Sequence, residues 1–253
     1  MHEVLVEVVE GGVGVVTLNA PERRNAISLE LVAEVADALA TLESSGDVGA
    51  VVITGAAPAF CAGAVLDTLI GSDRARLEKI YDGFLRVARS PLPTVAAVNG
   101  AAVGAGVNLA LSCDVILAGE SARFIARFLD LGVFPGGGHT WMMQRAVGVQ
   151  GAFAMDVFGD ELSGPEAAAA GLAWRCVPDD ELADRALVLA RFAASAPTET
   201  VQRLKSVINE MPTVESHDDA VAIEVEHQLW SLSTPEASER LAKMAARISS
   251  RSR

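Results

Sequence analysis

The most informative part of the chain lies between Arg89 and Asp114 and includes Pro91-Leu92-Pro93-Thr94-Val95-Ala96-Ala97-Val98-Asn99-Gly100-Ala101-Ala102-Val103-Gly104-Ala105-Gly106-Val107-Asn108. Residues 90–113 carry no charge. Residues 95–98 predict a buried strand, and the glycines that follow predict a turn that opens a helix. A helix start presents unpaired backbone N–H groups and the positive end of the helix dipole. We therefore expect this turn to face an anion, or an oxygen that becomes one during a reaction.

Two other interpretations of this stretch are weaker. A membrane helix needs about 20 predominantly apolar residues, but prolines, glycines and two asparagines interrupt this run. A dinucleotide-binding loop also joins a strand to a helix through glycines. Here Gly104-Ala105-Gly106 lacks the third glycine of the G-x-G-x-x-G spacing, so that signal is weak.

The flanking sequence predicts an α/β fold. Residues 4–9 and 14–18 predict an antiparallel hairpin, and Ser28 is placed to cap a helix that continues to about residue 45. Residues 50–54 and 115–118 are further short apolar strands. Short buried strands that alternate with helices indicate a sheet covered on both faces.

The last third of the chain has a different character. A short strand is expected near residues 173–177, and from residue 180 the sequence is helical, with breaks at Pro197, Pro212 and Pro235. We therefore divide the chain into an α/β core over residues 1–195 and a helical region over residues 196–253. A run of helices that trails an α/β core often packs on neighbouring subunits, so we expect this region to mediate oligomerisation.

Composition excludes several classes of function. The 253 residues are half apolar, which suits a sizeable core, and the net charge of −13 argues against nucleic acid or an anionic membrane as partner. The cysteines (Cys61, Cys113 and Cys176) are odd in number and have no C-x-x-C spacing. This favours reduced thiols in the cytoplasm over a disulfide or a metal site. The first residues run directly into strand-like sequence, so no signal peptide is expected.

A second small-residue turn follows residues 51–54 and reads Ala59-Phe60-Cys61-Ala62-Gly63-Ala64. Two such turns, each at the end of a buried strand, bring backbone N–H donors toward one point if the strands are neighbours. An oxyanion hole requires this arrangement, with donors about 2.7–3.1 Å from the developing charge. The alternative is that the small residues serve only tight packing.

Together these motifs resemble the enoyl-CoA hydratase/isomerase family, also called the crotonase superfamily, over almost the whole chain. The resemblance is carried by residues 19–27, 60–64 and 96–106, by Cys113-Asp114 and Ala122-Arg123-Phe124, and by residues 132–138 and 166–172. It implies a crotonase-type spiral of ββα units with a C-terminal helical region. Family members associate as trimers or dimers of trimers.

The resemblance also implies an acyl-CoA thioester as substrate or ligand, with no separate cofactor. In the family, two backbone N–H groups hold the thioester carbonyl, and by motif position these belong to Ala64 and Ala105. Ala105 stands where the family usually has glycine, but it keeps its N–H. The adjoining turn residues Ala62, Gly63 and Gly104 are assigned to ligand binding.

Two departures from the family pattern decide the expected chemistry. The family's hydratases use two glutamates to position and activate water, and here their places are taken by Asn108 and Phe128. Neither side chain is a general base near neutral pH. Water addition by the two-carboxylate route is therefore not expected.

Two other titratable residues are candidates for acid–base work. If the segment after Phe128 is extended, Phe128 and Asp130 point to the same face, and Asp130 then faces the acyl pocket. The alternative is that Asp130 caps a turn or pairs with Arg127 or Arg123. His139 follows three glycines in the first turn of a helix over residues 140–147 and is either an acid–base group or a helix-end residue.

The acidic chain needs local cations to hold the phosphates of CoA. By family position the candidates are Arg23, Arg24 and Lys205, and for each the alternative is a solvated surface charge. We therefore expect an acyl-CoA enzyme that stabilises an enolate and catalyses double-bond isomerisation or another proton transfer in preference to ordinary hydration. The alternative is a non-catalytic acyl-CoA-binding protein with a degenerate site.

Overall fold

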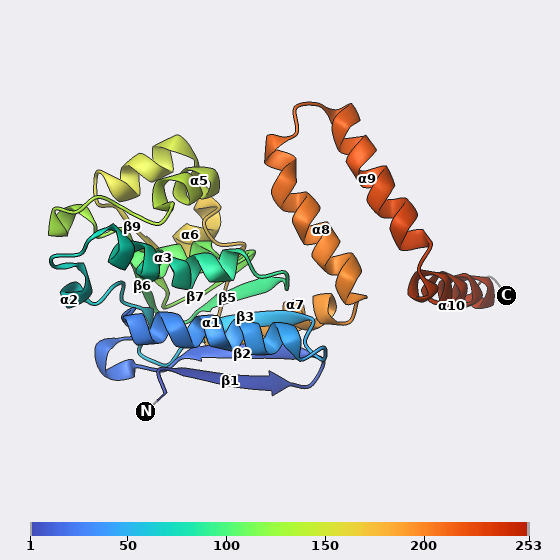
Figure 1. The fold of residues 1–253 in the computed structure, drawn as a ribbon, viewed down its shortest axis with the longest axis horizontal. Helices are drawn as coiled ribbons and strands as arrows, with labels where there is room; N and C mark the ends of the chain where they lie inside the picture. The colour runs from blue at the N-terminus through green and yellow to red at the C-terminus, as the bar shows by residue number, and fades with distance from the viewer. Residues whose placement is uncertain (1, 252–253) are drawn as a thin grey trace. The chain divides into compact units, whose positions relative to one another are not determined.

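The computed structural model describes residues 2–251 and divides the chain into two compact units, Met1–Ser195 and Ala196–Arg253. The first unit repeats a strand–strand–helix pattern, coloured blue to orange along the chain in Figure 1. In the repeats that begin at β3, β5 and β7, the first strand joins a six-stranded sheet and the second joins a four-stranded sheet. The order of strands is β1-β2-β3-β5-β7-β10 in the larger sheet and β4-β6-β8-β9 in the smaller one.

The strands are β1 (Val4–Val9), β2 (Val13–Leu18), β3 (Ala50–Gly55), β4 (Ala59–Cys61), β5 (Thr94–Val98), β6 (Ala101–Val103), β7 (Val115–Gly119), β8 (Arg123–Ile125), β9 (Glu161–Ser163) and β10 (Arg175–Val177). The helices of the first unit are η1 (Pro21–Arg23), α1 (Leu29–Ser44), α2 (Leu66–Leu69), α3 (Arg74–Ala88), α4 (Ala105–Leu111), η2 (Leu129–Leu131), α5 (His139–Asp156), α6 (Gly164–Ala170) and α7 (Leu182–Ala194).

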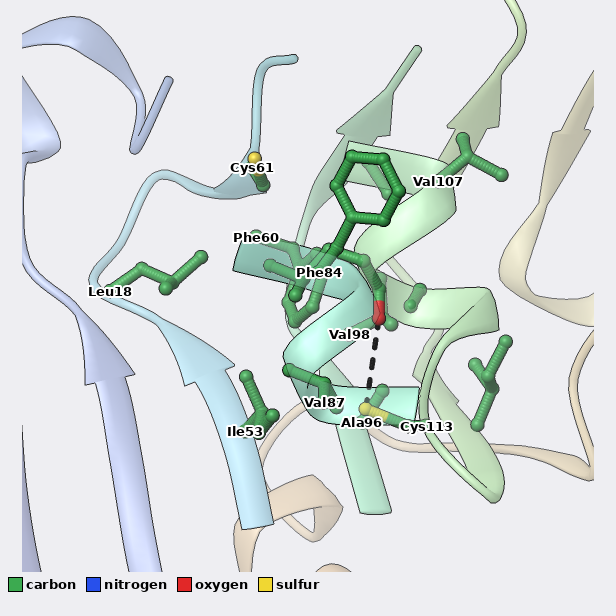
Figure 2. Packing of buried hydrophobic residues seen from close by; sticks show 14 of the residues in the cluster. Leu18, Ile53, Phe60, Cys61, Phe84, Val87, Ala96, Val98, Val107 and Cys113 are labelled. Atoms are coloured by element: carbon green, nitrogen blue, oxygen red, sulfur yellow. Dashed lines mark hydrogen bonds between the residues drawn. The ribbon is translucent and has the colours of Figure 1, made fainter. Parts of the chain in front are cut away.

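The larger sheet is covered on both faces, as predicted. β1 and β2 form the expected antiparallel hairpin, and the other neighbours in this sheet are parallel. Side chains alternate along β3: Ile53 packs in a cluster with α1 and α3, whereas Val52 packs in a second cluster with α7. Figure 2 shows the first cluster, with Ile53 and Val98 of the sheet beside Phe84 of α3.

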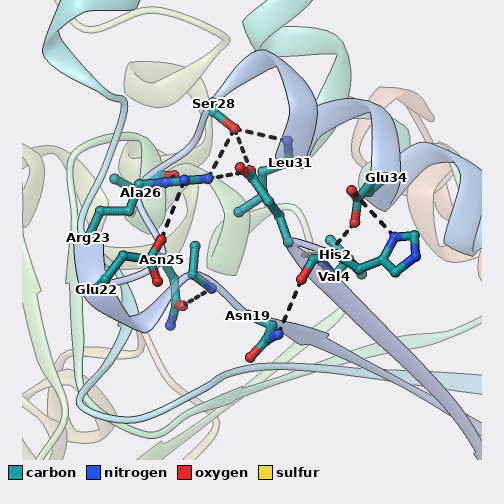
Figure 3. Close-up of polar contacts among 12 residues, drawn as sticks. His2, Val4, Asn19, Glu22, Arg23, Asn25, Ala26, Ser28, Leu31 and Glu34 are labelled. Atoms are coloured by element: carbon teal, nitrogen blue, oxygen red, sulfur yellow. Dashed lines mark hydrogen bonds and ion pairs between the residues drawn. The ribbon is translucent and has the colours of Figure 1, made fainter.

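The start of α1 is held by a polar cluster (Figure 3). Ser28 caps the helix by accepting a hydrogen bond from the Leu31 N–H at 3.0 Å, and it donates to Glu3 at 2.6 Å. Arg23 forms an ion pair with the same carboxylate. Burial acts to raise the pKa of Glu3, but the hydrogen bonds from Ser28 and Arg23, with the positive charge of Arg23, hold that pKa below its ordinary value.

The uncharged stretch forms β5, the short strand β6 and α4, so a second strand lies between the predicted strand and the predicted helix. β5 is fully buried in the middle of the larger sheet, and β6 lies in the middle of the smaller one. The glycine-rich turn therefore closes β6 at the junction with α4. No helix within residues 2–251 is both long and apolar enough to cross a bilayer.

The second unit consists of α8 (Thr198–Glu210), η3 (Met211–Thr213), α9 (His217–Leu232) and α10 (Pro235–Arg251). The predicted breaks are found: Pro197 precedes α8, Pro212 lies in η3, and Pro235 begins α10. Val207 is the one buried hydrophobic residue among the described part of this unit. Large apolar side chains are instead exposed on all three α-helices, including Leu204, Leu229 and Met244.

Candidate active site

The turn after β4 is pinned by a parallel bridge to residue 27. The Ile27 N–H donates to the Gly63 carbonyl at 2.7 Å, and the Val65 N–H donates to the Ile27 carbonyl at 3.0 Å. Backbone groups alternate in direction along an extended segment, so the N–H of Ala64, between these two residues, points away from Ile27. Among the described residues this N–H donates no hydrogen bond. It is therefore available to an acceptor that is not part of the chain.

The side chain of Asn25 links β4, which leads into this turn, to the segment at residues 20–27 by hydrogen bonds to the backbone of both. Its side chain is completely buried, its Nδ2 donates to the Ala59 carbonyl at 2.7 Å, and its Oδ1 accepts from the Ala20 N–H at 2.9 Å. The Ala62 N–H donates to the Arg24 carbonyl at 2.9 Å. The segment at residues 20–27 thus acts as a rigid support for the turn. This supporting role of Asn25 was not predicted from the sequence.

The two glycine-bearing turns pack against each other. A Cβ placed on Gly63 would lie 2.8 Å from the Val103 carbonyl oxygen and 3.9 Å from the Ala105 nitrogen. Ala105 is the first residue of α4, where an N–H has no acceptor within the helix. β4 and β6, which lead into the two turns, are parallel neighbours in the smaller sheet. Their pairing brings Ala62, Gly63 and Ala64 beside Gly104 and Ala105.

Asn108, Phe128 and His139 gather beside this helix start. The Phe128 ring lies 3.7 Å from the point where a Cβ on Gly104 would stand, and it meets the His139 ring edge-on at 4.7 Å between centroids. Asn108 is 2% exposed, and its Oδ1 lies 2.5 Å from His139 Nδ1. Its Nδ2 donates to the Gly136 carbonyl at 3.0 Å. These three predicted residues therefore form one contiguous group.

His139 also contacts Asp156, which sequence analysis did not consider. His139 Nε2 lies 2.8 Å from Asp156 Oδ1, and the histidine is 1% exposed. The two residues begin and end α5, and 17 residues of straight helix would separate them by about 25 Å. Gly148, at φ 72° and ψ 176°, breaks the helix into two segments that fold back on each other (Figure 1). A glycine in the middle of the predicted helix was the one feature of the sequence that could have indicated this reversal, and with it the contact between His139 and Asp156.

Asp130 does not share a face with Phe128, because the extended segment on which that interpretation depended is not formed. Leu129–Leu131 form a 3₁₀ turn instead of an extended segment, and a 3₁₀ turn directs residues two apart to different sides. The Asp130 side chain is 69% exposed and pairs with Arg127, with 3.1 Å between Nε and Oδ2. This ion pair is the structural alternative that the sequence left open.

The three candidate cations differ in their surroundings. Arg23 forms an ion pair with Glu3 and donates hydrogen bonds to the Ser28 hydroxyl at 3.2 Å and to the Ala26 carbonyl. Its guanidinium therefore supports the fold. Arg24, the next residue, is exposed. Lys205 lies on α8 in the second unit and is half-buried.

Cys61 adjoins the first turn but is not a nucleophile of this site. The thiol is completely buried, and burial raises its pKa to about 12. The thiolate is the reactive form of cysteine. At neutral pH this residue therefore serves packing between β4 and α4.

Comparison with known proteins identifies the family. Residues 9–244 match the enoyl-CoA hydratase/isomerase family model. A protein of Mycobacterium tuberculosis named "probable enoyl-CoA hydratase" is 45% identical over 92% of this chain and 94% of its own length. The 1,2-epoxyphenylacetyl-CoA isomerase of Escherichia coli is 37% identical over 84% of each chain. The crystal structure of an enoyl-CoA hydratase subunit I from Geobacillus kaustophilus superposes with a TM-score of 0.89, at 29% identity over 97% of this chain and 95% of the other.

The chain belongs to the enoyl-CoA hydratase/isomerase family and has the crotonase fold. The resemblance inferred from its motifs and the predicted fold class are thereby confirmed. Membership makes it an acyl-CoA-processing protein of a family whose named relatives include hydratases and an isomerase.

Proposed function

We propose that the chain binds the thioester carbonyl of an acyl-CoA between the N–H groups of Ala64 and Ala105, and that it catalyses double-bond isomerisation or another proton transfer. Two preorganised donors stabilise the enolate oxygen more than the ground-state carbonyl, which lowers the barrier to removal of the α proton. The uncommitted N–H of Ala64 and the close packing of the two turns support this site.

We prefer isomerisation or another proton transfer to hydration because of one observation: Asn108 pairs with His139, and Phe128 packs on the same ring. Asn108 and Phe128 replace the two glutamates of the hydratases, and both side chains pack on the His139 ring. Of the two titratable candidates, His139 contacts this group, whereas Asp130 is exposed and pairs with Arg127. We infer that His139 serves the site and Asp130 does not. The Escherichia coli relative, named an isomerase, is consistent with this chemistry.

A non-catalytic acyl-CoA-binding protein is the second candidate. It is favoured by the hydrogen bonds that already engage Asn108 and His139, since groups so committed are poorly placed to take a proton from a ligand. Under either proposal Arg24, an exposed residue of the supporting segment, is the better candidate of the arginine pair for a CoA phosphate.

The deciding experiment measures exchange of the α protons of butyryl-CoA with D₂O, isomerisation of a 3-enoyl-CoA, and hydration of crotonyl-CoA by the purified full chain. We expect exchange and isomerisation with little hydration. Substantial hydration of crotonyl-CoA by the wild-type chain would contradict the proposal. Thermal stabilisation by butyryl-CoA without exchange or isomerisation would instead establish the binding protein.

A further inference from the structure

A continuous chain of buried hydrogen bonds runs from Asp156 through His139 to Asn108 in the first turn of α4. Asn108 and His139 are buried, and the Asp156 side chain is 10% exposed. The chain ends on the Gly136 carbonyl, which accepts from Asn108 Nδ2. Burial of a polar network is costly unless every member has a partner, so a complete network of this kind fixes the orientation of each group.

The carbonyl of Gly136 determines the direction of these hydrogen bonds. A carbonyl oxygen can only accept, so the Asn108 atom that faces Gly136 at 3.0 Å is the amide nitrogen. Asn108 Oδ1 is then the acceptor at 2.5 Å from His139, and His139 Nδ1 is the donor. On the other side of the ring, Nε2 faces the carboxylate of Asp156 at 2.8 Å. Both ring nitrogens therefore donate when Asp156 is ionised.

We propose that Asp156 is a positioning residue of the acyl-CoA site: through His139 it holds the Asn108 carboxamide, and with it the first turn of α4 that carries the N–H of Ala105. This inference rests on the proposed function, because it assigns the effect to the oxyanion-binding turn. Among the described residues, the groups in hydrogen-bond or ring contact with the His139 imidazole are Asn108, Asp156 and Phe128, and of these Asp156 alone has a titratable side chain.

The expected consequence is a change in kcat rather than in KM. Asn108 stands three residues after Ala105, so a loosened carboxamide moves the donor that binds the enolate oxygen. Most of the binding energy for CoA comes from parts of the ligand remote from this turn, and that energy is retained. Removal of a residue that orients a metal ligand typically costs roughly 10- to 100-fold in activity, and we expect a loss of similar size for a residue that orients the oxyanion-binding turn.

The experiment compares the wild type with Asp156→Asn, Asp156→Ala and Asp160→Asn. Asp156→Asn keeps the size and an acceptor but loses the charge, and Asp160 is an exposed aspartate four residues further on. For butyryl-CoA exchange in D₂O we expect kcat to fall roughly 10- to 100-fold in both Asp156 variants, with KM within about twofold of the wild type. Asp160→Asn should match the wild type. Circular dichroism and thermal melts identify a variant that fails to fold.

Nitrogen NMR of ring-labelled histidine gives a readout that a merely structural role would not move. The signals of His139 are assigned by their loss in His139→Gln. In the wild type the Nδ1 signal should be that of a nitrogen that donates a hydrogen bond, and in Asp156→Ala the Nε2 signal should shift because its partner at 2.8 Å is lost. Butyryl-CoA should shift the His139 signals of the wild type.

The outcomes separate this inference from the proposed function. Absence of exchange in the wild type contradicts the proposed function, whereas the NMR titration still tests the link between His139 and the ligand. The inference is overturned if butyryl-CoA leaves the His139 signals unchanged. It is equally overturned if Asp156→Ala keeps the wild-type kcat and ring spectrum, or if it raises KM alone.

Discussion

At the scale of single residues, Ala105 offers a direct test of the proposed oxyanion hole. It occupies the first position of α4, where proline is tolerated because its N–H has no helical acceptor. Ala105→Pro should keep the helix and remove one donor, so enolate formation should fall by about 10²–10³. Ala105→Gly retains the N–H and is the matched control. The measurement is the α-proton exchange rate, and equal rates for the proline and glycine variants would exclude a role for this N–H.

Glu3 gives a pH dependence that can be assigned to one carboxylate. Its pKa is lowered in the folded chain, so its contribution to stability is complete above the ordinary glutamate pKa and is lost as the pH falls through the lowered value. Glu3→Gln should therefore reduce the free energy of unfolding at neutral pH and bring it closer to the wild-type value at about pH 3. Urea unfolding at the two pH values measures this.

The matched control for Glu3→Gln is Glu7→Gln, because Glu7 is an exposed glutamate on β1, the strand that begins directly after Glu3. We expect its urea midpoints to follow those of the wild type. If Glu3→Gln is equally destabilising at both pH values, the effect comes from packing at the start of α1 rather than from the ionised carboxylate.

At the scale of an element, the kink in α5 is what brings His139 and Asp156 together. The φ and ψ of Gly148 lie in a region that is essentially restricted to glycine, and a side chain there costs on the order of 1–3 kcal/mol. Gly148→Ala should destabilise the fold by about that amount. It should also change the His139 ring spectrum and lower kcat.

Gly46→Ala is the control for backbone strain. Gly46 follows α1, has a φ of 73°, and a Cβ there meets no atom within 4 Å. Gly46→Ala should destabilise the chain without changing the NMR signals of His139. If both variants alter the His139 spectrum, or neither does, the kink is not what positions the pair.

At the scale of the whole molecule, the helices of residues 196–253 carry apolar side chains that the described chain leaves exposed. On α10, Leu241, Met244 and Ile248 recur at helical spacing, and each is more than half exposed. We infer that these helices join copies of the chain. Met244→Glu should then lower the assembly state measured by light scattering.

Ala246→Glu introduces the same charge on the opposite side of α10, where it should leave the assembly state unchanged. A wild-type chain that is monomeric at micromolar concentration would refute an oligomerising role for the region. Equal effects of Met244→Glu and Ala246→Glu on the assembly state would also refute this role.

Some parts of the site could be predicted from motifs alone, because local sequence places their backbone. Ala64 and Ala105 follow short strands and small-residue turns, and the structure shows those turns packed together. The direction of Asp130 stayed open because a short segment can be extended or form a 3₁₀ turn, and the structure has the turn with the ion pair to Arg127. Asp156 could not be found by spacing, since its contact with His139 depends on one glycine in the middle of α5.

Sequence patterns were enough to predict the strands of the larger sheet, the helical character of the last third and the cap of α1. These features follow from periodicities of two and 3.6 residues and from side-chain hydrogen bonds to nearby backbone, all of which are local. Which groups meet at the start of α4 could be seen only in the folded chain. That convergence depends on β4 pairing with β6 and on the reversal of α5, and the contacts that drive both join residues far apart in the chain.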